Sequence, residues 1–154
     1  MKILAVLPLF LILFGGCSQK GAFSNFELTR EQELSISNTQ RSKITSLEKV
    51  EGTFTALYLN NIYPDVYQEK NAFLVFLYTK DSIDPKELLF HANGKKVLNI
   101  EEVKEKEEFK DLVRMQNSWN SCYFMEFEKD EEREIKFGVQ SSNYKSTLLV
   151  YKKI

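Results

Sequence analysis

The side chains that most often carry catalysis are scarce in this chain of 154 residues. It contains two cysteines, Cys17 and Cys122, and one histidine, His91. No nucleophile elbow, phosphate-binding loop or zinc-protease motif occurs, and a lone His without clustered Cys or carboxylate partners cannot build the usual zinc site. We therefore expect no cofactor, no metal and no familiar enzyme. An enzyme of unrecognised type is an alternative, which would need a deep polar pocket with Glu126, Asp130 or Cys122 as candidate lining.

Acidic residues cluster at 101–108 and 130–132, and Asp81 and Asp84 flank Ser82-Ile83. Calcium prefers oxygen ligands, but none of these runs has the alternating spacing of a calcium-binding loop. Runs of mixed charge are more typical of solvated faces and turns. They predict no metal site.

The aromatic residues suggest a binding surface. Tyr63 and Tyr67 lie in a predicted loop over residues 60–71, and Trp119 stands at the start of a predicted strand. Exposed rings at one end of a fold can stack on sugar or contact a protein partner. Alternatively, Trp119 belongs to the core and the tyrosines cover their own loop. Trp119, Tyr63 and Tyr67 are the candidate binding residues.

The remaining two reactive side chains have plainer interpretations. His91 falls in a predicted hairpin strand, and we expect it to be a surface or edge residue. Cys122 lies between aromatic residues with no His or Arg nearby in the sequence. Reactive thiols need exposure and positive neighbours, so Cys122 is predicted to be buried and inert.

The first 16 residues have the pattern of an export signal. Lys2 gives a positive start, and residues 3–14 form an apolar run of twelve residues. A membrane-spanning helix needs about 20 apolar residues. A short apolar run that follows a positive start and ends in small residues is typical of a removable secretory signal.

The segment Leu13-Phe14-Gly15-Gly16-Cys17 resembles the lipobox of bacterial lipoproteins. The resemblance implies a diacylglycerol on the Cys17 sulfur, cleavage before Cys17 and acylation of the new amine. Because two or more acyl chains anchor a protein stably, lipid on Cys17 would hold this one on a membrane. The alternative is an ordinary signal cleaved near Gly16. Ser18 in place of an acidic residue implies the outer membrane, facing the periplasm, rather than the inner membrane; exposure on the cell surface is a further option.

Charge and length limit the expected partners and the ways in which the fold can be stabilised. Loss of residues 1–16 would take Lys2 from the 21 basic residues and leave all 22 acidic ones, with signs interspersed. No basic patch suits a phosphate backbone, so nucleic acid is not an expected partner. If Cys17 is lipidated, Cys122 has no disulfide partner within the chain. A domain of this length can be held by its apolar core alone.

Patterning divides the chain into a signal (1–16), a lipidated polar linker (17–46) and a β domain (47–154). In the linker, a capping box at Thr29-Arg30-Glu31-Gln32 predicts a short helix, and residues 41–46 a short strand. Asn93-Gly94 predicts a tight hairpin, and residues 84–87 and 106–115 predict short helices. The predicted strands of the β domain are 53–59, 72–79, 88–92, 95–100, 119–127, 134–140 and 146–152.

Short strands, frequent turns and few helices predict a mainly β fold, an antiparallel β-sandwich with one or two short helices. An immunoglobulin-like arrangement is one option, although the typical Cys–Cys pair is missing. The order of motifs is similar to that of small bacterial lipoproteins with no assigned activity. The leading hypothesis is a membrane-anchored, non-catalytic binding or assembly module of the envelope with a protein partner. A carbohydrate-binding surface domain and an unfamiliar enzyme are the alternatives.

Overall fold

The computed structural model describes residues 28–80, 83–104, 109, 112 and 117–154. The predicted signal, Cys17 and most of the predicted helix 106–115 lie outside the described residues, so those predictions stay predictions. None of the helices formed by the described residues combines the length and apolar character that a bilayer span requires.

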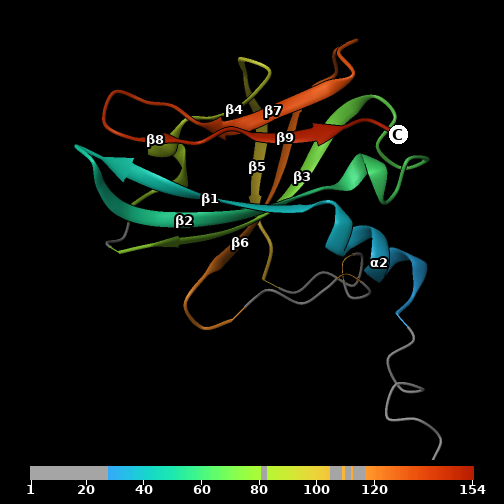
Figure 1. Ribbon diagram of the computed structural model, residues 1–154, viewed down its shortest axis with the longest axis horizontal. Helices are drawn as coiled ribbons and strands as arrows, with labels where there is room; N and C mark the ends of the chain where they lie inside the picture. Colours follow the sequence, from blue (N-terminus) through green and yellow to red (C-terminus); the bar gives the residue numbers. More distant parts are fainter. Residues whose placement is uncertain (1–27, 81–82, 105–108, 110–111, 113–116) are drawn as a thin grey trace, which may run out of the picture.

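In the part of the chain that the structure describes, nine strands form one antiparallel sheet curled into a half-barrel (Figure 1). The strands are β1 (Thr39–Ser46), β2 (Lys49–Tyr58), β3 (Lys70–Thr79), β4 (Phe90–Ala92), β5 (Lys95–Glu102), β6 (Ser121–Glu128), β7 (Glu134–Val139), β8 (Lys145–Ser146) and β9 (Leu149–Lys152). Their order across the sheet is β8-β1-β2-β3-β6-β5-β4-β7-β9. The predicted mainly β, antiparallel class is confirmed.

The predicted sandwich and its immunoglobulin-like variant are not confirmed. A sandwich needs two separate sheets packed face to face. Here β5 pairs with β6 along residues 97–102 and with β4 through Lys95 and Lys96. Hydrogen bonding therefore passes from one half of the sheet to the other, and the two halves enclose a common core.

Local sequence signals explain the helices and the tight turn. The capping box before α2 (Arg30–Ser37) is formed, with Thr29 Oγ1 accepting from Gln32 N at 3.3 Å and Gln32 Oε1 accepting from Thr29 N at 3.0 Å. The predicted Asn93-Gly94 turn is also confirmed, with φ angles of 48° and 75° that suit a type I′ hairpin. The short 3-10 helices are η2 (Leu59–Asn61) and η3 (Pro85–Leu88).

An aromatic core fills the concave face of the half-barrel. We call it the inner core, and its central contact is the stacking of Phe73 on Phe137, with ring centroids 4.4 Å apart. A second, outer cluster on the convex face includes Leu74, Phe76 and Cys122. Strand β3 contributes to both, which confirms the prediction that it is covered on both faces.

The two edges of the curled sheet meet where β9 approaches β1. The Gln40 side chain donates from Nε2 to Val150 O at 2.5 Å and accepts from Val150 N at 3.2 Å. Nearby, the Tyr151 hydroxyl donates to Ala56 O at 2.7 Å. The predicted single strand 146–152 is split, because β8 pairs with β1 while β9 pairs with β7.

The half-barrel has two unlike ends. At the closed end, β2 finishes at Tyr58 and β3 begins at Lys70; at the open end, β3 finishes at Thr79 and β6 begins at Ser121. Helix α2 joins the closed end, where Tyr58 N donates to Asn38 O at 3.2 Å. Figure 1 shows α2 and the C-terminus together on that side of the molecule.

Candidate functional site

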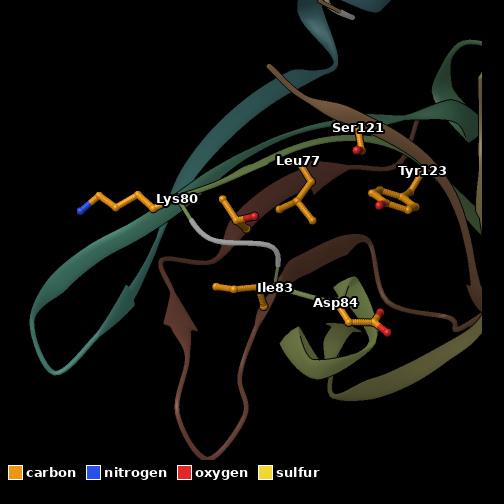
Figure 2. A pocket seen from close by; sticks show the side chains of 7 residues that line it. Leu77, Lys80, Ile83, Asp84, Ser121 and Tyr123 are labelled. Atoms are coloured by element: carbon orange, nitrogen blue, oxygen red, sulfur yellow. The ribbon is translucent and has the colours of Figure 1, made fainter. Parts of the chain in front are cut away.

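A pocket of about 430 Å³ lies at the open end of the half-barrel (Figure 2). It is lined by Leu77, Thr79, Lys80, Ile83, Asp84, Ser121 and Tyr123. Figure 2 shows Leu77, Ser121 and Tyr123 on one side and Ile83 and Asp84 on the other, whereas Lys80 extends away. Mouths of β-barrels are common sites for ligands.

The short strand β4 helps to explain why the pocket forms here. β4 has three residues, and only His91 and Ala92 pair with β5, next to the hairpin. The far half of β5, residues 97–102, is paired with β6 instead. Ile83 and Asp84, in the chain that leads to β4, lie across the pocket from Leu77 and Tyr123 (Figure 2).

Strand register places the polar groups on the concave face. Ser121 lies opposite Leu77 and Tyr123 opposite Val75, and both of these β3 residues belong to the inner core. Directly opposed residues of antiparallel strands project to the same face. The pocket is thus the last layer of the inner core, where hydroxyl groups replace rings and aliphatic chains.

Two carboxylates lie near the Tyr123 hydroxyl. Glu102 is the cross-strand partner of Tyr123, and Asp84 lines the pocket. Burial raises the pKa of Tyr123 above its ordinary value, and the charges of Glu102 and Asp84 raise it further, against a lowering hydrogen bond with Ser121. Among the residues that the structure describes, none forms an ion pair with either carboxylate.

Trp119 stands beside this end of β6. Its side chain is 77% exposed, so the interpretation of Trp119 as a core residue is wrong. The turn that carries it is held by two side chains, since Asn117 Oδ1 accepts from Trp119 N at 2.9 Å and Asn120 Oδ1 accepts from Asn117 N at 3.1 Å. The backbone is therefore ordered while the indole faces solvent.

The other two candidate residues lie elsewhere. Tyr63 and Tyr67 are half-buried against the outer cluster, and the Tyr67 ring lies 5.9 Å from the ring of Phe124. Their loop precedes β3 at the closed end, whereas Trp119 precedes β6 at the open end. The structure brings the two tyrosines together and does not bring Trp119 to them.

The residues suggested for an unfamiliar enzyme are scattered. Cys122 is buried as predicted, on the convex face, and burial raises the pKa of its thiol to about 12. Glu126 pairs with Lys70 at 3.0 Å. Asp130 lies at the closed end, on the far side of the core from the pocket. These side chains share no cavity with the open-end pocket.

At the closed end, Asp130 forms the centre of a polar network. Its carboxylate accepts from Lys153 Nζ at 2.7 Å, from Asn93 Nδ2 at 3.0 Å and from Glu132 N at 3.1 Å. Burial raises the pKa of Asp130, but these donors and the charge of Lys153 outweigh burial and hold it below its usual value. The ion pair between Asp130 and Lys153 connects the turn after β6 to the residues that follow β9.

A second pair of polar side chains lies near that network. The Tyr58 hydroxyl donates to Asn71 Oδ1 at 3.0 Å, and Asn71 Nδ2 donates to Glu128 O at 3.1 Å. Burial raises the pKa of Tyr58, and the charge of Asp130 adds to the effect. Both Tyr58 and Asn71 are almost fully buried. At the closed end, these buried polar side chains therefore have hydrogen-bond partners within the protein.

His91 is not the edge residue that the sequence suggested. β4 lies between β5 and β7, with His91 opposite Lys96 and Gly138. Both ring nitrogens are buried and have no hydrogen-bond partner among the described residues. Burial lowers the pKa of His91, which disfavours the charged form of the half-buried ring.

Sequence reasoning missed the pocket because its residues come from separate elements. The one available signal was the pair of hydroxyl residues Ser121 and Tyr123, in the same strand phase as the core residues Met125 and Phe127. Among the described residues, no group of three or more His, Cys, Asp or Glu side chains is placed to hold a metal ion. Comparison with protein-family models, curated proteins and solved structures finds no match.

Proposed function

We propose that this chain is a lipid-anchored, non-catalytic binding module of the bacterial envelope. The observation that carries the proposal is the position of the pocket and Trp119 at the open end, whereas α2 joins the closed end. A chain tethered through Cys17 would then present its binding end away from the lipid. The outer membrane, facing the periplasm, is the location we propose from Ser18.

The chemistry of the open end favours binding over catalysis. The pocket lining offers hydroxyls, one carboxylate and Lys80, whose side chain extends away from the cavity. Asp84 already uses Oδ1 to accept from Lys86 N at 2.9 Å. Among the residues that the structure describes, no His or Cys lines the pocket. An exposed indole on an ordered turn is a typical interface anchor, because burying its large surface contributes strongly while little further ordering is needed.

Site-specific cross-linking in intact cells tests the binding role. A photo-reactive residue in place of Ser118, which is exposed beside Trp119, should give a defined adduct. The same residue in place of Val66, exposed at the closed end, serves as the control. The adduct from position 118 should disappear in a chain that also carries Trp119→Ala. An adduct of equal yield from both positions, insensitive to Trp119→Ala, would count against the proposal.

The anchor is tested separately. Cys17→Ser should abolish incorporation of labelled fatty acid and leave the uncleaved precursor. Normal processing of that variant would refute the anchor without affecting the open-end site.

Carbohydrate binding is a second candidate, favoured by the exposed ring of Trp119. Because the chain contains one tryptophan, its fluorescence reports on that ring alone. Oligosaccharides of the envelope should shift or quench the emission if sugar stacks there. Unchanged emission across a panel of such sugars would remove this candidate.

A further inference from the structure

The open-end pocket has a charge and shape that indicate a class of ligand. We infer that it binds an alkylammonium group, carried by a lysine side chain of a partner or by a small amine. The geometry consists of the Asp84 carboxylate in the lining, an apolar wall beside it, and Glu102, which lies outside the lining as the cross-strand partner of Tyr123. The lysine form of this inference rests on the proposed binding function; the ammonium site itself does not.

The carboxylates supply the charge. Asp84 lines the pocket, and Glu102 lies directly across from Tyr123 on the neighbouring strand. No cation among the described residues pairs with either one. Lys80 lines the rim, but its chain extends away from the cavity (Figure 2). Both carboxylates are exposed to solvent, so a cation that enters the pocket would find negative charge with which no described residue forms an ion pair.

The remaining lining fits an alkyl stem with an ammonium head. Leu77 and Ile83 give aliphatic contact, and the Tyr123 ring adds an aromatic surface that favours a nearby cation. The hydroxyls of Ser121 and Tyr123 can accept from ammonium N–H groups. A volume of about 430 Å³ lies within the range of small-ligand pockets.

Other ligand chemistries fit less well. Calcium takes six to eight oxygen ligands, and the described residues contain no group of three or more carboxylate, His or Cys side chains placed for a metal. An anion would be repelled by both carboxylates. A purely apolar ligand would displace water from the half-buried hydroxyls of Ser121 and Tyr123 without replacing their hydrogen bonds, which costs free energy.

Titration of the purified full-length chain in detergent, followed by calorimetry, tests the site with n-butylamine hydrochloride as the probe. n-Butanol is the neutral control of the same size, and butyrate is the anionic control. We expect saturable binding of the amine alone, weakened at high salt because the attraction is between charges. Binding of n-butanol with equal affinity would overturn the inference.

Matched variants test which carboxylate attracts the ammonium group. Asp84→Asn should weaken amine binding about tenfold, as expected for loss of a charge-assisted hydrogen bond. Glu102→Gln should weaken it by a smaller factor of about twofold to threefold, because an exposed carboxylate outside the lining attracts the ammonium through screened charge alone. Glu101→Gln, on the same strand but the opposite face, should leave it unchanged. If Asp84→Asn disturbs the cap of η3, Glu102→Gln still decides the result. Amine binding unaffected by either Asp84→Asn or Glu102→Gln would refute the site.

Cross-linking distinguishes the two sources. If a partner inserts a lysine, the adduct from position 118 should be reduced by excess n-butylamine and by Glu102→Gln. If a small amine is the ligand, the calorimetric binding persists while the adduct is unaffected. Absence of any adduct contradicts the proposed function, and absence of amine binding contradicts this inference, so the two failures are separable.

Discussion

Each end of the half-barrel carries an aspartate, a lysine and a tyrosine, but the aspartate and lysine form an ion pair only at the closed end. At the closed end, Asp130 pairs with Lys153 at 2.7 Å, and Tyr58 donates to Asn71. At the open end, Asp84 lines a pocket with Tyr123, and Lys80 extends away from both. The contrast shows that residue type alone does not separate a structural polar group from a binding one; the presence of partners does.

The difference has an electrostatic origin. In the closed end, opposite charges meet inside a partly buried site, so each polar group compensates the burial of another. In the open end, the Asp84 carboxylate and the hydroxyls of Ser121 and Tyr123 line a cavity, where a ligand can supply a partner. Stability should therefore depend on the closed end, and recognition on the open end.

The largest expected effect comes from the two aspartates. Asp130→Asn should lower the free energy of unfolding by about 2 kcal/mol, because the half-buried Lys153 ammonium loses its counter-charge. Asp84→Asn should change it by less than about 0.5 kcal/mol, since an amide oxygen can still cap η3. Urea unfolding followed by circular dichroism measures both changes. Equal losses of stability would contradict the claim that the closed end contributes more to stability than the open end.

The two tyrosines give a smaller version of the same test. Tyr58→Phe should cost about 1–2 kcal/mol, because it leaves the buried Asn71 oxygen without its donor. Tyr123→Phe should cost less than about 0.5 kcal/mol, since its hydroxyl faces the pocket. Thermal unfolding of the matched pair provides the measurement; a larger loss for Tyr123→Phe would mean that the open end is structural as well.

The pH dependence of the free energy of unfolding should distinguish the contribution of His91 in β4 from that of Asp130 at the closed end. Burial lowers the pKa of His91 below its ordinary value of 6.5, so its contribution to stability is complete above pH 6.5 and is lost as the pH falls from there through the lowered pKa of the folded state. Asp130 has a lowered pKa against an ordinary 3.8, so its contribution is lost only in more acidic solution.

Unfolding measured from neutral to acidic pH should show both steps. His91→Gln should remove the slope near the ordinary histidine pKa, and Asp130→Asn should remove the more acidic one. A single slope removed by neither variant would contradict the assignment.

The smallest expected effect belongs to Trp119. Trp119→Ala should change the free energy of unfolding by less than about 0.5 kcal/mol, as expected for an exposed side chain outside the core. In the unmodified protein, acrylamide should quench the indole almost as efficiently as free tryptophan. Protected emission would show that the ring is covered in solution and would remove it from the open-end surface.

Local chemistry made much of the fold predictable. The capping box at Thr29, the cap at Asp84 and the Asn93-Gly94 turn are each set by a few neighbouring residues, and all three are formed. The double apolar phase of β3 likewise predicted burial on both faces. These features depend on short-range geometry, which the sequence records directly.

Long-range arrangement could not be predicted in the same way. Whether two runs of strands form a sandwich or one curled sheet depends on β5 bonding to both halves, and no local pattern specifies that. Trp119 shares the strand phase of Phe127 yet lies in the turn before β6. The pocket joins β3, β6 and the chain before η3, so it exists only once the register is known.

The seam between β1 and β9 has a consequence for the route by which the protein folds. The Gln40 amide bonds to a residue 110 positions further along the chain, and Ser42 reaches Thr147 from a similar distance. Contacts of such sequence separation form slowly, because a long loop must close before they contribute. A growing chain that lacks its last strand cannot join the two edges of its sheet. If the polypeptide crosses a membrane before folding, as the predicted signal implies, this delay would keep it extended enough for transport, and completion of the seam would follow on the far side.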